Sequence, residues 1–129
     1  MERTVKIDGR EVRFRASAAI PRMYRLKFRR DIIQDMREIQ KAIQEAQEAR
    51  EAEGEESGEE AGSPLPLEAL TLFENVAYLM ARHADPGSVP GSVEEWLDGF
   101  GTFSIYTVFP AIQELWAENL QALNTPKKK

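Results

Sequence analysis

The sequence predicts a mainly helical α+β domain, in which an N-terminal β-hairpin is followed by a compact bundle of about four helices with an acidic disordered linker. Near the start, two runs of alternating apolar residues flank Asp8-Gly9. Further along, apolar residues recur at the helical spacings of three and four. Residues 45–60 carry eight Glu and nothing apolar larger than alanine. The 129 residues suffice for one domain with a modest core.

The hairpin is predicted over residues 3–14. Asp8-Gly9 fits a two-residue type I′ turn, which fixes the strand register. The register predicts three cross-strand pairs: Ile7–Arg10, Lys6–Glu11 and Val5–Val12. One face of the hairpin then carries its apolar side chains: Val5, Ile7, Val12 and Phe14. Because a lone hairpin is marginal in water, this face must pack on the helices.

A single long helix is predicted over about residues 18–50, with Ser17 as its cap or Pro21 in its first turn. Apolar residues follow one another along a continuous helical stripe: Tyr24, Phe28, Ile32, Met36, Ile39, Ile43 and Ala46. The aromatic residues of the basic stretch 22–30 lie on this stripe. The cations of the same stretch project from the other sides of the predicted helix. The stripe therefore favours packing over stacking on nucleic-acid bases, which would require aromatics standing among the cations.

The glutamate-rich segment, about residues 51–64, is the expected disordered linker. It cannot bury enough apolar surface to offset the entropy of ordering it. We therefore expect the acidic segment, roughly residues 47–63, to be dispensable for folding.

The helical body is predicted over residues 65–123. Its first helix runs from about Leu67 to Ala84, with apolar residues on two sides that indicate a central position. A short helix then begins at a capping box, Ser92-x-x-Glu95, and carries Trp96 and Phe100 on one side. We expect these two rings in one apolar cluster with the final helix.

The final helix is predicted from the sequence that follows residue 103. It directs one set of apolar residues inward: Val108, Ile112, Leu115 or Trp116, and Leu120. Pro110 either begins the regular part of this helix or kinks it, because proline lacks a backbone donor. The basic tail, residues 124–129, is expected to be unstructured.

The net charge of −5 is unevenly distributed. Residues 1–41 hold 12 Lys and Arg against 6 Asp and Glu, a net charge of +6, whereas residues 42–126 hold 2 against 16, a net charge of −14. The opposed poles can orient the molecule against a partner or a second copy. The acidic half would repel phosphates, so we expect no general nucleic-acid binding.

No enzymatic chemistry is expected. His83, the one histidine, sits at a predicted helix end, where a cation complements the helix dipole. The absence of cysteine fits a reducing cytoplasm and removes thiolate chemistry. No His/Cys cluster or calcium-loop pattern is present, so no metal or cofactor is expected. No apolar run approaches the roughly 20 residues of a membrane helix, and the first residues lack an apolar signal core.

The expectation that remains is recognition of a partner at the protein surface, and aromatic residues are the best candidates for its contacts. Six of the eleven aromatics fall within residues 96–116, more than a small domain readily buries. The predicted protein-interaction residues combine the basic helix start with this aromatic region: Tyr24, Arg25, Phe28, Arg29, Trp96, Phe100, Phe103, Tyr106 and Trp116.

Several short motifs occur in a characteristic order. They are a "KIDG" hairpin, a Tyr-x-x-x-Phe-x-x-Asp helix start (Tyr24, Phe28, Asp31), "AYLMA" at 77–81, "EWLDGF" at 95–100 and "ELWAEN" at 114–119. In this order and spacing the chain resembles the tail assembly chaperones of long-tailed, siphovirus-type phages and prophages of Gram-positive hosts. The resemblance covers nearly the whole chain except residues 45–64, where the family would tolerate a variable insertion.

The resemblance implies a non-enzymatic chaperone that binds the long, helical tape measure protein. It would keep this client soluble and extended, act in several copies or by self-association, and help to recruit tail tube subunits that then displace it. Such a protein would work in the host cytoplasm and be absent from the mature virion. The family often has a longer form made by programmed frameshifting, and the three lysines at 127–129 would lie at or beside the slippery site.

Two alternatives stay open. A nucleic-acid-binding regulator would use the basic helix at residues 22–30, with affinity that falls steeply as salt rises. A structural tail or head-completion component would instead stay in the virion.

Overall fold

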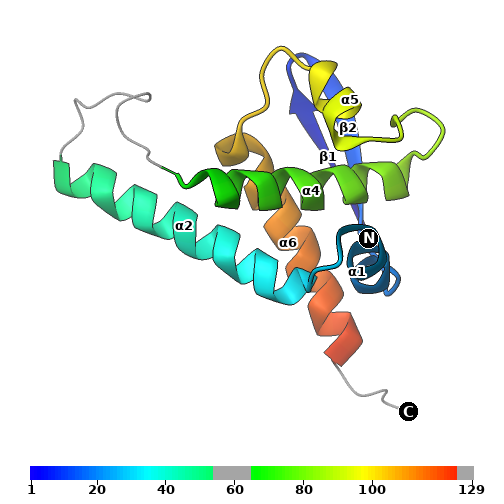
Figure 1. The fold of residues 1–129 in the computed structure, drawn as a ribbon, viewed down its shortest axis with the longest axis horizontal. Coiled ribbons are helices and arrows are strands. Elements are labelled where there is room, and N and C mark those ends of the chain that lie inside the picture. Colours follow the sequence, from blue (N-terminus) through cyan, green and yellow to red (C-terminus); the bar gives the residue numbers. More distant parts are fainter. Residues whose placement is uncertain (54–64, 125–129) are drawn as a thin grey trace.

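The computed structural model describes residues 1–53 and 65–124 and confirms the predicted fold class (Figure 1). Two strands and five helices follow one another along the described chain: β1 (Glu2–Ile7), β2 (Arg10–Arg15), α1 (Ile20–Phe28), α2 (Ile32–Glu53), α4 (Leu67–Ala84), α5 (Val93–Asp98) and α6 (Ile105–Asn124). The disordered linker was predicted over about residues 51–64 and the unstructured tail over residues 124–129. Residues 51–53 and Asn124 are helical instead, and the rest of both segments, 54–64 and 125–129, lies outside the described residues.

The hairpin has the predicted register, with Val5 paired to Val12 and Lys6 to Glu11. Asp8 and Gly9 both have positive φ angles, 56° and 80°, as a type I′ turn requires. On the predicted apolar face, Ile7 and Phe14 are buried and the two valines are partly buried.

The hairpin tip is held by the loop between α5 and α6. The Gly101 amide donates to Asp8 Oδ2 at 2.7 Å, and Arg10 donates to the Gly99 carbonyl at 3.2 Å. At the other end of the sheet, Arg3 of β1 pairs with Glu114 and Glu118 of α6. These polar contacts fix the sheet against the helices while its apolar face closes the core.

Helix α4 occupies the centre of the molecule, as its two apolar sides predict. It contacts β2, α1, α2, α5 and α6, and Figure 1 shows it crossing the middle of the fold. Half of its residues are buried: Ala69, Leu72, Phe73, Val76, Ala77, Tyr78, Leu79, Met80 and Ala81. Burial of this helix on several sides makes it the main element of the hydrophobic core.

The prediction of one helix over residues 18–50 is wrong. The chain turns a corner at residues 29–31, where Arg29 adopts the left-handed conformation (φ 60°) and its N–H bonds to the Arg25 carbonyl at 2.8 Å. Asp31 Oδ1 then accepts from the Ile33 N–H at 3.0 Å and caps the next helix. Helix α2 extends to Glu53, three residues beyond the predicted end.

A buried carboxylate secures this corner. Asp35 in α2 is 1% exposed, and its Oδ2 accepts the Tyr24 hydroxyl at 2.7 Å. Arg30 donates to both oxygens of the same carboxylate, at 2.8 and 2.9 Å. Burial, together with this carboxylate, raises the pKa of Tyr24, so the phenol stays protonated and remains a donor. One carboxylate thus ties α1, the corner and α2 together.

The C-terminal helices begin as the sequence predicts. Ser92 Oγ accepts from the Glu95 N–H at 3.1 Å and caps α5. Pro110 lies inside α6, which begins at Ile105, so the regular helix starts before the proline. The predicted inward residues of the final helix are buried: Val108, Ile112, Leu115 and Trp116. The side chain of Leu120 lies outside the part of the chain that is described.

Trp96 and Phe100 join the same core as the α6 residues, as predicted. Trp96 is buried, and its ring lies 5.4 Å from the Phe100 ring, centroid to centroid. It reaches α4 directly, through an edge contact with Tyr78 at 5.8 Å.

We predict that Asp35→Ala lowers the free energy of unfolding by about 2–4 kcal/mol, because Tyr24 and Arg30 lose a shared charged acceptor. Urea titration of the whole chain measures this change. Glu48→Ala, which removes an exposed glutamate farther along the same helix, is the control and should change stability by no more than about 0.5 kcal/mol. Equal stability of the two variants would show that the corner does not depend on Asp35.

Stability should also fall at mildly acidic pH because of His83. Burial, and then the positive charge of Arg15, lowers the pKa of this imidazole, whose Nε2 lies 2.9 Å from Ser17 Oγ. The unfolded chain therefore binds the proton more tightly than the folded protein, and stability falls as pH drops below about 6.5. The melting temperature should decrease more for the wild type than for His83→Gln between about pH 7.5 and about pH 5.5. Parallel decreases would contradict this assignment.

Candidate functional site

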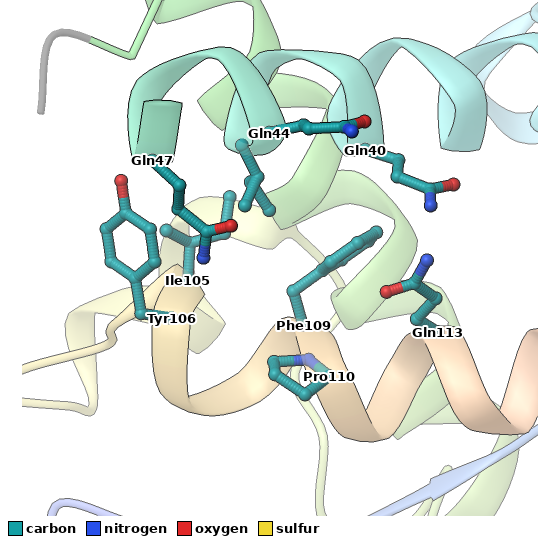
Figure 2. Close-up of a pocket in the computed structure, with 9 residues that line it drawn as sticks. Gln40, Gln44, Gln47, Ile105, Tyr106, Phe109, Pro110 and Gln113 are labelled. Carbon is teal, nitrogen blue, oxygen red and sulfur yellow. The ribbon is translucent and has the colours of Figure 1, made fainter. Parts of the chain in front are cut away.

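An open groove between α2 and α6 is the best candidate for a functional site (Figure 2). Its volume is about 340 Å³. Helix α2 forms one wall with Gln40, Ile43, Gln44 and Gln47. Helix α6 forms the other with Ile105, Tyr106, Phe109, Pro110 and Gln113. The walls come from segments far apart in the sequence, so the groove exists only in the folded protein.

The α2 wall follows from helical spacing. Gln40, Gln44 and Gln47 are separated by four and three residues, which places them on one face of the helix. Ile39 and Ala46, on the neighbouring face, are buried in the core, whereas the three glutamines are exposed. Core packing of one face thus directs a row of amides into the groove.

The α6 wall is mostly apolar. Phe109 is buried at the base of the groove, and its ring makes an edge contact with Phe73 of α4 at 6.2 Å. Tyr106 stands at one end of the groove, and the amides of Gln40 and Gln113 point toward each other from the facing helices (Figure 2). The groove therefore has an apolar base with polar amides along its sides.

No lining residue carries a charge, although 30% of the chain is charged. Glutamine amides both donate and accept hydrogen bonds, so they can pair with peptide groups or with uncharged polar side chains. The isoleucine, phenylalanine and proline surfaces favour an apolar occupant. This combination suits one face of an amphipathic helix laid into the groove.

Three of the seven aromatic candidates from the sequence lie in a separate cluster. Trp96 packs against Phe103 at 5.2 Å, Phe100 packs against Phe103 at 5.4 Å, and Phe103 continues to Phe73 at 5.4 Å. The guanidinium of Arg10 covers the outer ring of this cluster, 4.4 Å from the Phe100 centroid. These rings therefore support the hairpin tip and the α5–α6 loop.

The remaining candidates are divided between the core and the surface. Tyr24 is buried and packs against the half-buried Phe28, with the two rings tilted at 51° and their centroids 5.0 Å apart, so the Tyr24 ring is not available to stack on a base. Arg25 and Arg29 are exposed, and Trp116 is buried. Of the nine predicted interaction residues, only Tyr106 lines the groove.

The other groove residues were not predicted. The spacing of Gln40, Gln44 and Gln47 is a local signal that could have drawn attention to this face of α2. No such signal links the face to Gln113, because that pairing depends on how two distant helices cross.

Within the described residues, no group of three or more His, Cys, Asp or Glu side chains is arranged to hold a metal ion. None of the helices described in Figure 1 is both long enough and apolar enough to cross a membrane. Comparisons with models of protein families, with curated proteins and with solved structures found no match to the chain.

Proposed function

We propose that the protein is a non-enzymatic tail assembly chaperone of a siphovirus-type phage or prophage, and that it holds the tape measure protein in the α2/α6 groove. The uncharged groove with its apolar base is the observation that carries this proposal. A very long helical client exposes apolar stripes until the tail tube surrounds it. A groove that covers such a stripe would keep the client soluble in the host cytoplasm.

The groove chemistry supports transient binding of many similar client segments. The exposed Pro110 and the half-buried Ile43 offer apolar contact that is not directional, so affinity does not require one particular client side chain. Gln44 and Gln113 add hydrogen bonds that either a donor or an acceptor satisfies. Several copies would then bind along one client, and arriving tail tube subunits would displace them.

The motifs of the resemblance also support the proposal, because they build the helix that forms one groove wall. Tyr24 donates a hydrogen bond to Asp35 of α2, Phe28 packs against the Tyr24 ring, and Asp31 caps the first turn of α2. The Tyr-x-x-x-Phe-x-x-Asp pattern thus has a physical purpose, which is to set the corner from which α2 extends.

Co-expression with the tape measure protein of the same genome tests the proposal. The wild-type chain should carry the client into the soluble fraction and co-purify with it. Gln44→Arg combined with Gln113→Arg should reduce recovery by about tenfold, because both walls then bring unpaired charge to an apolar base. Gln34→Arg is the matched control, since this exposed glutamine of α2 lies outside the groove and should leave recovery unchanged.

Equal recovery with the groove variant and the control would contradict the assignment of the groove. Finding the chain in purified mature particles would contradict a chaperone and favour a structural tail or head-completion component.

The proposed longer form is tested by the nucleotide sequence, where an adenine run at the lysine codons 127–129 should precede a second overlapping reading frame.

A further inference from the structure

We propose that a second surface, a pocket between α1 and α4, binds an acidic amphipathic segment of a partner protein. This α1/α4 pocket has a volume of about 530 Å³ and is lined mainly by Met23, Leu26, Lys27, Leu79, Arg82 and His83. It shares no lining residue with the α2/α6 groove. The proposal goes beyond the proposed function and does not depend on it.

The pocket has an apolar base with one exposed apolar side chain at its edge. Leu79 is buried and Met23 is half-buried, so together they form an apolar floor. Leu26 is 62% exposed, which is unusual among the large apolar residues that the structure describes. A single exposed leucine is ordinary on a soluble protein, but this one borders a concave apolar surface that an incoming side chain can fill.

The charge of the pocket is positive and unpaired. Arg82 donates to the carbonyls of Pro90 and Val89, at 2.9 and 3.3 Å, and makes no ion pair within the described residues. Lys27 Nζ lies 5.7 Å from the centroid of the Tyr78 ring and likewise has no carboxylate partner in that part of the chain. No carboxylate lines the pocket.

Further cations lie on α1 and at its C-terminal cap, outside the lining of the pocket. Arg22, Arg25 and Arg29 are all exposed, and none of them forms an ion pair among residues 1–53 and 65–124. A carboxylate arriving here meets several unpaired cations, and these would accelerate its association and favour acidic partners over basic ones.

The chemistry points to a peptide segment that carries both leucine-sized side chains and carboxylates. A nucleic acid could satisfy the cations but not the apolar floor, and the nearby Tyr24 ring is buried and unable to stack on a base. The chain's own acidic residues, 45–60, have the charge but no apolar side chain larger than alanine. A separate protein with an acidic amphipathic helix supplies both features. With both surfaces occupied, one chain would hold two proteins at once.

A designed helical peptide tests the proposal by fluorescence anisotropy with the whole chain at about 0.15 M salt. The probe is a labelled peptide of about 18 residues, with leucine at helical spacing and glutamate beside it. There are two matched control peptides. In one, every glutamate is replaced by lysine, and in the other every leucine is replaced by serine. We expect the leucine/glutamate peptide to bind at least about tenfold more tightly than either matched peptide.

Variants of exposed residues separate recognition from folding. Leu26→Ser and Lys27→Glu should each weaken binding by about tenfold, because one removes apolar contact and the other reverses a charge. Ile33→Ser and Lys41→Glu make the same changes at exposed positions of α2 and should leave binding unchanged. Circular dichroism should confirm that all four variants keep the wild-type helix content.

Three results would overturn the proposal. The first is equal binding of the glutamate and lysine peptides, and the second is unchanged binding by both pocket variants. The third is displacement of the peptide by a competitor of another kind. A single-stranded oligonucleotide that displaced the peptide would assign the cations to nucleic acid. If the chain self-associates in sedimentation experiments and the peptide dissociates it, the pocket would be assigned to self-association.

Discussion

The buried carboxylate of Asp35 is the interaction on which both candidate surfaces depend. Burying a charge is costly unless hydrogen bonds and an opposite charge compensate it, and here Tyr24 and Arg30 supply three bonds. These bonds connect α1 to α2 across the corner that Arg29 and Asp31 create. Helix α2 therefore leaves the core in one direction and faces α6, while α1 lies against α4.

The two surfaces differ in the chemistry that they offer. The α2/α6 groove is uncharged and presents amides beside an apolar base, so it suits an uncharged helical stripe. The α1/α4 pocket combines an apolar floor with unpaired cations, so it suits an acidic segment. Cations thus line the α1/α4 pocket, and no charged residue lines the α2/α6 groove, a difference that would let the two surfaces distinguish partners electrostatically.

The elements that local signals specify could be predicted from the sequence, and those that depend on tertiary contacts could not. The Asp8-Gly9 turn and the Ser92 cap act within a few residues, so the hairpin and α5 were predicted with their register and start. The α1–α2 corner was missed because the apolar stripe stays in phase across it. Arginine at position 29 does not indicate a helix end in the sequence, because a non-glycine residue rarely adopts the positive φ that it has here. The groove was missed because only the crossing of α2 and α6 brings Gln113 opposite the α2 amides.

The direction of α2 relative to α6 is the most direct test of this account, and electron spin resonance can measure it. The chain contains no cysteine, so cysteines introduced at Glu48 of α2 and Thr107 of α6, both exposed and outside the groove, carry the only spin labels. The account predicts one narrow distance distribution for the wild-type background and a broad one when Asp35 is replaced by alanine. A distribution that stays equally narrow without Asp35 would contradict the claim that this carboxylate holds the groove in shape.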